Sequence, residues 1–298
     1  MFQVDVDYLK KAKKRKDHGK TVILVFLTLA GLVSLLPLVY LFCTAFKPAE
    51  ELFLYPPTFF VKNPTLQNFK DLTAITANSV VPFSRYLFNT ILITVAYIFC
   101  LVLILTMACY PLSKHKFPGR NGLMNLVTTS MMFVAAAAAI PSYLIITSLG
   151  IDNTYLVYII PGLANTTCLF LMKQFLDTVP NDIFEAGKID GASEWQLYTK
   201  IAIPLLKNAQ ATVIILTFGG IWGDAATSTT YIYKEQLRTL GFFMNTIGGG
   251  IARTGAGAAS GLIMTLPSII IFIIQQSRVM DTICLLYTSP SPRDSTSS

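Results

Sequence analysis

Long apolar runs without a charged side chain alternate with short polar segments along this 298-residue chain. A helix needs roughly 20 mostly apolar residues to cross the hydrocarbon core of a bilayer. Five runs reach that length, and each predicts a membrane-spanning helix. They are Thr21 to Phe46, Tyr86 to Ser113, Asn121 to Ile151, Asn153 to Met172 and Thr254 to Ser277.

A sixth run, Asn208 to Gly223, is shorter, because Lys207 and Asp224 bracket it and two glycines interrupt it. Counting it as a span predicts an all-α, polytopic membrane domain of six helices over residues 21–282. The first run is too long for a signal peptide and no small-residue cleavage site follows it, so we expect a retained helix.

Composition agrees with this pattern, since 53% of the residues are hydrophobic and only 13% are charged. Such a charge deficit excludes an ordinary soluble domain. Four cysteines lie in or beside the apolar runs with no metal-binding spacing, and we interpret them as packing residues. They are Cys43, Cys100, Cys109 and Cys168.

Lysine and arginine positions predict the orientation, because cytoplasmic segments are enriched in them. The densest basic run, Lys10 to Lys20, lies in the tail formed by residues 1–20 and places the N-terminus in the cytoplasm of a multi-pass plasma-membrane protein. Contact with anionic lipid is favoured over nucleic-acid binding for this tail. Six crossings then leave Ser113 to Arg120 and Lys173 to Lys207 inside. The expected outer segments are Lys47 to Arg85, Gly150 to Asn153 and Asp224 to Arg253.

Catalytic patterns are missing from the sequence. Both histidines, His18 and His115, lie in basic tracts, and there is no GxSxG, HExxH or GxxxxGK(S/T) motif. We therefore expect a transporter subunit and not an enzyme, with no metal site and no cofactor of its own. Energy for transport against a gradient would come from a partner or from an ion.

The second cytoplasmic loop, residues 173–207, carries a compact polar pattern. Asn181 as N-cap and Gly191 as stop predict a short helix from Asp182 to Asp190. Its small apolar side would hold Ile183, Ala186 and Gly187, and Glu185 and Lys188 would be close enough to pair.

A second short helix is predicted directly after the first. Ser193 and Gln196 have the spacing of a capping box, and Pro204 would turn the chain toward the membrane. Trp195, Tyr198 and Ile201 would anchor this helix. Composition leaves two roles for the loop evenly matched: docking into a groove of another protein, and an elbow lying on lipid head groups.

The stretch from Glu185 to Pro204, "EAGKIDGASEWQLYTKIAIP", resembles the signature loop of permease subunits of binding-protein-dependent ABC importers. The family pattern is EAA, three residues, G, nine residues, I, x, L, P. Here Gly187 replaces the second alanine and Ile203 replaces the leucine. The resemblance implies contact with an ATPase by Glu185, Ala186, Gly187, Asp190, Gly191, Ala192, Ile201 and Pro204.

Other stretches resemble the carbohydrate-importer branch, in particular its maltose-permease-like second subunit. These are "YLFNTILIT" from Tyr86, "ACYPLSKHKFPGR" from Ala108 and "IPSYLIITSLGIDNTY" from Ile140. Two places depart from it: "WGDAATSTTY" from Trp222, and the five alanines that begin at Ala135. Those alanines favour close helix packing, with room beside a translocation path as the alternative.

The resemblance implies a type I ABC importer permease fold and a transmembrane subunit that forms half of a pathway for a sugar or oligosaccharide. Its implied partners are a second homologous permease, two ATP-binding subunits, an extracytoplasmic solute-binding protein and membrane lipid, without nucleic acid. ATP and Mg would be bound by the partner ATPase. The alternatives are a non-sugar solute, an ion-coupled carrier and a membrane-embedded enzyme or scaffold. Deep ionisable residues, which ion coupling usually needs, are absent from the confident spans.

Polar residues at bilayer depth are candidates for the solute pathway: Asn89, Asn165, Thr166 and Thr167. For each of them an interhelical hydrogen bond is an equally good interpretation. In the last outer loop the resemblance implies contact with the binding protein, through Tyr231, Tyr233 and a flexible glycine cluster around Gly249. Residues 283–298 are low in complexity, and we expect them to lie outside the native fold.

Overall fold

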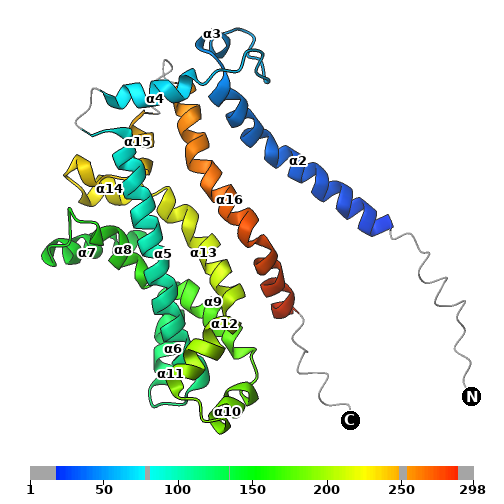
Figure 1. The fold of residues 1–298 in the computed structure, drawn as a ribbon, viewed down its shortest axis with the longest axis vertical. Coiled ribbons are helices and arrows are strands. Elements are labelled where there is room, and N and C mark those ends of the chain that lie inside the picture. The colour runs from blue at the N-terminus through cyan, green and yellow to red at the C-terminus, as the bar shows by residue number, and fades with distance from the viewer. Residues whose placement is uncertain (1–17, 78–80, 134, 248–253, 288–298) are drawn as a thin grey trace, which may run out of the picture.

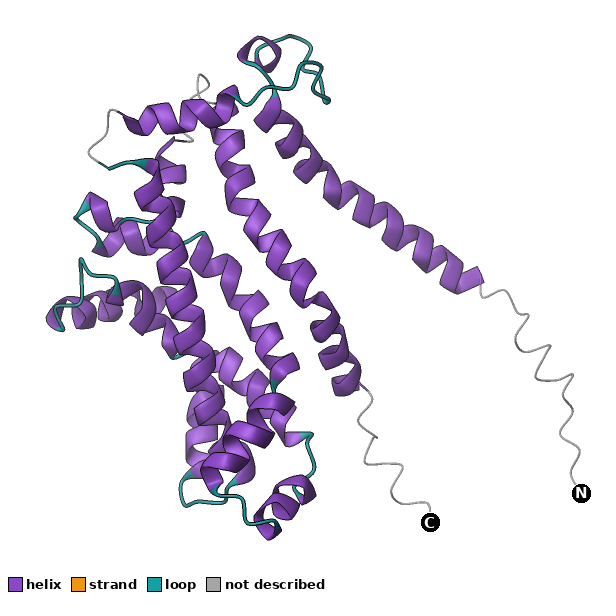
Figure 2. Cartoon of the chain, in the orientation of Figure 1, coloured by secondary structure: helices purple, strands orange, loops and turns teal. Residues whose placement is uncertain are grey.

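The computed structural model describes residues 18–77, 81–133, 135–247 and 254–287, and every regular element within them is helical (Figure 2). The first half of the chain contains α2 (His18–Phe46), α3 (Ala49–Leu52), α4 (Gln67–Ala77), α5 (Phe83–Lys114), α6 (Arg120–Met131) and α7 (Ala135–Ser148). The second half begins with α8 (Leu156–Leu163), α9 (Thr166–Asp177), α10 (Asp182–Ile189), α11 (Glu194–Gln196), the π-helix η1 (Leu197–Ala202) and α12 (Ile203–Leu205). It ends with α13 (Lys207–Trp222), α14 (Ala226–Tyr231), the 3-10 helix η2 (Glu235–Leu237), α15 (Leu240–Ile247) and α16 (Thr254–Tyr287). The all-α prediction is confirmed.

Three described helices, α2, α5 and α16, are long and apolar enough to cross a membrane alone. The pair α8 and α9 bends by 48° at its junction, as a broken span or a re-entrant loop does, and α7 contains a shorter apolar helix, Ala137–Ser148. The sixth run forms α13, which is bent by 65° from the segment Glu194–Leu205 before it. Each predicted run therefore holds apolar helix, but the third and fourth are interrupted and are not continuous spans.

The second interruption, between α8 and α9, has a local cause. After Pro161 in α8, the Asn165 side chain accepts from the Cys168 backbone N–H at 3.0 Å and starts a new helix. Prolines alone do not decide the breaks, because α5 and α16 continue past Pro111 and Pro267.

Helix α5 is the central element and runs between the two ends of the molecule (Figure 1). We call these the α4 end, where α3, α4 and α15 lie, and the α10 end, where α6, α10 and α11 lie. Toward the α10 end, α5 packs on α9, η1 and α13 through buried residues such as Leu101, Leu105, Met172 and Leu197. Toward the α4 end it packs on α15, which shares a second core with α16 and α4.

Helix α2 stands apart from the remaining helices and packs mainly on α16 (Figure 1). Its apolar side chains are exposed over most of its length; Phe26, for example, is 69% exposed. A helix with apolar residues on all sides and few protein neighbours is solvated by lipid or covered by another membrane subunit.

The predicted outer segments contain more structure than expected. Residues 47–85 form α3 and α4, and residues 224–247 form α14, η2 and α15. Helix α15 is largely buried, with Leu240 fully covered, so this part is not a flexible loop. The glycine cluster with Gly249 lies outside the described residues, as does most of the basic N-terminal tail.

The boundaries of the membrane domain also shift. Helix α2 begins at His18, inside the segment that we assigned to the tail. Helix α16 continues to Tyr287, past the expected boundary at residue 282, and residues 288–298 lie outside the described ranges.

Candidate functional site

The segment that resembles the permease signature loop projects at the α10 end of the molecule (Figure 1). It begins later than predicted, because α9 continues to Asp177. Lys173, expected as the first loop residue, is only 8% exposed and forms an i,i+4 ion pair with Asp177. This pair neutralises both charges and allows the helix to continue. We call residues 178–207 the coupling unit.

The first helix of the coupling unit, α10, matches the predicted boundaries within one residue. Gly191 ends it as expected: its φ is +82°, and the Ala192 backbone N–H donates to the Gly187 carbonyl at 3.0 Å. Asn181 occupies the predicted N-cap position, but its side chain does not cap the helix and instead accepts from Lys114 Nζ at 3.2 Å.

The face of α10 that packs inward differs from the predicted face. Phe184 is the buried residue, 5% exposed, and its ring lies 5.9 Å from that of Tyr110 on α5. Ile183 and Ile189 are 42% and 86% exposed. The large aromatic side chain occupies the core position, so the smaller apolar residues of the helix remain on the surface.

Gly187 lies where α10 approaches η1 most closely. A Cβ atom at this position would lie 2.6 Å from Leu197 Cδ2 and 3.1 Å from Ile201 Cδ1. Leu197 is fully buried and has little freedom to move. The close contact accounts for glycine at the position where the family pattern has alanine.

The second helix begins with the predicted capping box. The Gln196 backbone N–H donates to Ser193 Oγ at 3.3 Å, and the Ser193 N–H donates to Gln196 Oε1 at 2.9 Å. The chain then widens into η1, where the Ile203 N–H donates to the Tyr198 carbonyl, five residues earlier. Pro204 lacks an N–H and its ring would clash with the Lys200 carbonyl in a regular α-helix, which favours this wider turn.

Of the three predicted anchors, Tyr198 is buried at 7% exposure and its hydroxyl lies 3.0 Å from Thr106 Oγ1 of α5. Ile201 is half-buried, and Trp195 is 64% exposed. Most of the remaining residues implied for ATPase contact are accessible: Glu185, Ala186, Asp190, Gly191 and Pro204 are exposed, and Ala192 is half-buried.

A charged cluster that we did not predict holds the two helices together. Glu194 Oε1 lies 2.9 Å from Lys188 Nζ, so Lys188 pairs with Glu194 and not with Glu185 as expected. Glu194 Oε2 accepts from the Tyr110 hydroxyl at 3.0 Å and lies 3.4 Å from His115 Nε2. The Lys188 hydrogen bond holds the pKa of the Glu194 carboxyl below its usual value. The sequence feature that could have indicated this cluster is the group of basic residues after the second apolar run, because basic side chains attract an acidic partner.

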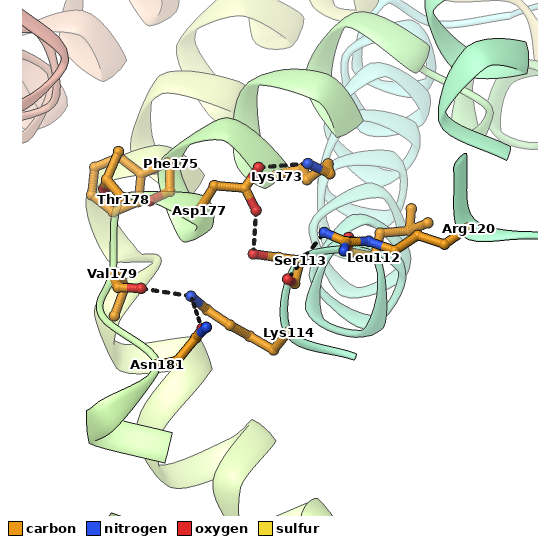
Figure 3. Close-up of polar contacts among 10 residues, drawn as sticks. All are labelled: Leu112, Ser113, Lys114, Arg120, Lys173, Phe175, Asp177, Thr178, Val179 and Asn181. Atoms are coloured by element: carbon orange, nitrogen blue, oxygen red, sulfur yellow. Dashed lines mark hydrogen bonds and ion pairs between the residues drawn. The ribbon is translucent and has the colours of Figure 1, made fainter. Parts of the chain in front are cut away.

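Side chains at the C-terminal turn of α5 bind the end of α9 and the beginning of the coupling unit (Figure 3). Lys114 Nζ donates to the Val179 carbonyl at 2.6 Å, and Ser113 Oγ donates to Asp177 Oδ1 at 2.6 Å. Arg120 Nε donates to the Leu112 carbonyl at 2.8 Å and so satisfies one of the free carbonyls at the end of α5.

The candidate pathway residues do not form one group. Asn89 is fully buried in α5, where its amide donates to the Gln236 and Arg238 carbonyls at 2.8 and 2.9 Å. Its oxygen accepts from the Tyr155 hydroxyl at 2.8 Å. These hydrogen bonds fit the alternative interpretation, and a pathway contact of Asn89 stays a prediction.

Asn165, Thr166 and Thr167 lie together at the break between α8 and α9. Asn165 and Thr166 are half-buried and Thr167 is exposed. Their position at this bend leaves the prediction of a pathway contact open.

The candidate binding-protein contacts lie near α7. The Tyr231 ring stacks on that of Tyr143 at 5.7 Å, and the Tyr233 hydroxyl lies 3.4 Å from the Tyr143 hydroxyl. Asn153 Oδ1 accepts from the Tyr233 backbone N–H at 3.2 Å. Tyr233 is 64% exposed and available to a partner.

A bundle of long apolar helices that carries an ordered polar helical unit at one end is the architecture of a polytopic membrane protein. The chain belongs to the family described as the binding-protein-dependent transport system inner membrane component, whose model matches residues 9–278. It is therefore a multi-pass transporter subunit, and ATP is hydrolysed by a separate subunit of the ABC importer.

Individual relatives agree with the family. The chain is 34% identical over 214 residues to "Protein LplC" of Bacillus subtilis, covering 70% of this chain and 68% of that protein. It is 27% identical over 258 residues to the galactooligosaccharides transport system permease protein GanQ of the same organism, covering 85% and 89%. A chain in the crystal structure of a bacterial ABC transporter involved in the import of the acidic polysaccharide alginate superposes with a TM-score of 0.73. That superposition has 20% identity and covers 93% of this chain and 99% of the other, so it supports the fold.

Proposed function

We propose that the chain forms half of the translocation pathway of an ATP-driven importer for a sugar or oligosaccharide. The observation that carries this proposal is the coupling unit, whose residues Glu185 to Pro204 have the family spacing and form an ordered surface beside the end of α5. The carbohydrate class is supported by the galactooligosaccharide permease among the relatives.

The complete importer would contain a second, homologous permease, two ATP-binding subunits and an extracytoplasmic binding protein. Binding of ATP would close the ATPases and draw the coupling units together, and the bundle would then open toward the loaded binding protein. In this arrangement the α10 end faces the cytoplasm, the N-terminus lies on the same side, and Tyr233 faces the binding protein.

The surface that faces the ATPase combines exposed apolar and charged side chains. Ile183, Ala186 and Ile189 would enter a cleft, while Glu185 and Asp190 would meet donors at its rim. Phe184 and the Glu194 cluster fix α10 through the side that packs on the rest of the chain. The helix is therefore already ordered before it binds, which lowers the entropic cost of docking.

The proposal is tested by purifying the chain with its partners and measuring ATP-dependent uptake in proteoliposomes. We expect uptake of a neutral oligosaccharide that depends on the binding protein and the ATPase. Uptake of only a non-sugar solute would contradict the carbohydrate class, and ATP-independent uptake driven by an ion gradient would contradict the whole proposal.

The docking surface is tested in the same assay by Gly187→Trp. The indole would collide with Leu197 and Ile201 and displace α10, so we expect a loss of ATPase from the complex and a fall in transport of about tenfold or more. Gly122→Trp is the matched control, because a Cβ atom there meets nothing within 4 Å. Normal transport by Gly187→Trp would show that α10 does not couple to the ATPase.

A further inference from the structure

The last turn of α5 is bound to the coupling unit by a charged side chain. Lys114 Nζ donates to the Val179 carbonyl at 2.6 Å and to Asn181 Oδ1 at 3.2 Å (Figure 3). Both acceptors lie in the turn that enters α10. The same ammonium group lies 5.2 Å from the centre of the Phe184 ring, inside α10 itself. One side chain of α5 therefore contacts both the beginning and the buried face of the helix proposed to dock the ATPase.

Two neighbouring side chains of α5 bind the elements on either side of α10. Ser113 Oγ donates to Asp177 Oδ1, at the end of α9, and the Tyr110 hydroxyl donates to Glu194 Oε2, at the beginning of α11. The end of α5 is thus joined to the coupling unit before, within and after α10. A displacement of α10 that left α5 in place would break several hydrogen bonds to charged groups, which are stronger than those between neutral groups.

The opposite end of α5 is joined as firmly to a different segment. The buried Asn89 amide donates to the carbonyls of Gln236 and Arg238, and Thr90 Oγ1 accepts from the Leu240 backbone N–H at 2.8 Å. Helix α5 has 32 residues, which corresponds to about 48 Å at helical rise. It is the one described helix whose two ends are each tied by side chains, to the coupling unit and to residues 236–240 at the α4 end.

We propose that α5 carries the movement of the coupling unit to residues 236–240, and that Lys114 is the positioning residue through which α5 follows α10. The proposal rests on the proposed function, since it assumes that α10 is moved by the ATPase. Lys114 contacts neither the ATPase nor the solute in this scheme. Its loss therefore separates ATP hydrolysis from transport, whereas loss of the docking surface removes the ATPase.

The test compares Lys114→Met with Lys116→Met in the reconstituted complex. Both changes remove one positive charge from the same short segment. Lys116, however, is exposed and makes no hydrogen bond or ion pair within the described part of the chain. The measurement is the number of solute molecules taken up per ATP hydrolysed, together with the amount of ATPase that co-purifies. Lys114→Arg is the conservative variant, because its guanidinium can still donate to both acceptors.

We expect Lys114→Met to retain the ATPase and its stimulation by the binding protein while uptake per ATP falls about tenfold, the loss expected for one to two hydrogen bonds to a charged donor. Lys116→Met should match the parent and Lys114→Arg should recover most of the ratio. An unchanged ratio in Lys114→Met overturns the proposal. A proportional fall in uptake and hydrolysis with the ATPase retained also overturns it, because Lys114 would then affect hydrolysis and transport equally.

A milder variant keeps the test decisive if Lys114→Met does not assemble. Asn181→Ala removes one acceptor and leaves the Val179 carbonyl to Lys114, so we expect a fall of about threefold in uptake per ATP. An unchanged ratio here contradicts the inference. Failure of the proposed function is distinguishable, because the parent complex would then show no uptake that depends on the binding protein.

Discussion

Glu194 shows how one exposed carboxylate can organise a functional surface. It lies directly after the capping residue Ser193 and contacts Lys188 of α10, Tyr110 of α5 and His115, the C-cap of α5. Surface ion pairs are individually weak, but a carboxylate that joins several partners fixes the relative position of the helices that carry them. Its neighbours on the sequence gave no indication of these contacts.

The pH dependence of this joint follows from the lowered pKa of Glu194. A carboxyl whose pKa falls on folding stabilises the native state at pH values above its unfolded pKa. That stabilisation is lost as the pH falls through the lower folded value. We expect Glu194→Gln to lower the melting temperature of the purified subunit by about 1–3 °C at neutral pH. The difference from the parent should vanish in acid, below the carboxyl range.

The measurement is thermal unfolding of both proteins from neutral to acidic pH. His115 and Lys188 face the same carboxylate, so Lys188→Met should reproduce most of the effect, while Lys116→Met should not. A difference between Glu194→Gln and the parent that persisted in acid would show that the charge of Glu194 is not what stabilises the joint.

At the scale of elements, the contact between α4 and α16 depends on one glycine. A Cβ atom on Gly255 would lie 2.2 Å from Asn68 Oδ1. The Asn68 side chain cannot move away easily, because it is buried and donates to the carbonyls of Ala45 and Lys47 at 2.9 and 2.8 Å. This asparagine therefore links the end of α2, α4 and the beginning of α16.

We expect Gly255→Ala to destabilise the subunit by about 1–3 kcal/mol, because the added methyl group overfills a fixed polar contact. Gly257→Ala is the matched control on the same turn of α16, where a Cβ atom meets nothing within 4 Å. It should be neutral or stabilising by up to about 1 kcal/mol. Equal unfolding midpoints for the two variants, measured by heat or by denaturing detergent, would contradict this account of the α4 contact.

At the scale of the whole molecule, the α4 end and the α10 end should face opposite sides of the membrane. Tyr55, in the loop between α3 and α4, is 93% exposed, and Ile189 at the end of α10 is 86% exposed. In intact cells we expect a membrane-impermeant maleimide to label Tyr55→Cys. It should label Ile189→Cys only after permeabilisation, because the proposed function places the coupling unit in the cytoplasm.

The parent chain provides the background for this experiment. Four of its five cysteines, Cys43, Cys100, Cys109 and Cys168, are half-buried or buried, and labelling of the parent measures the contribution of all five. Labelling of both introduced cysteines from the same side would contradict the arrangement of α5 as a complete crossing. It would also remove the basis for placing the N-terminus in the cytoplasm.

Local sequence signals were sufficient for features that depend on a few neighbouring residues. The apolar runs located the long helices, the Ser193 and Gln196 spacing predicted a capping box, and Gly191 predicted a helix end. The spacing from Glu185 to Pro204 identified the coupling unit. Hydropathy alone did not reveal the breaks in the third and fourth spans, because the residues at the breaks carry no charge and so do not end an apolar run.

The sequence by itself determined the class of fold, the existence of the coupling unit and the boundaries of α10, since helix periodicity, caps and hydropathy act over one or two turns. Only the tertiary structure decided which face of α10 is buried, which acid pairs with Lys188, and what Asn89 binds. These choices depend on side chains from α5 and from residues 236–240, far away in the sequence. The neighbours of a buried aromatic ring and the hydrogen-bond partners of a buried amide are set by the packing of distant segments. They cannot be read from the residues next to them in the sequence.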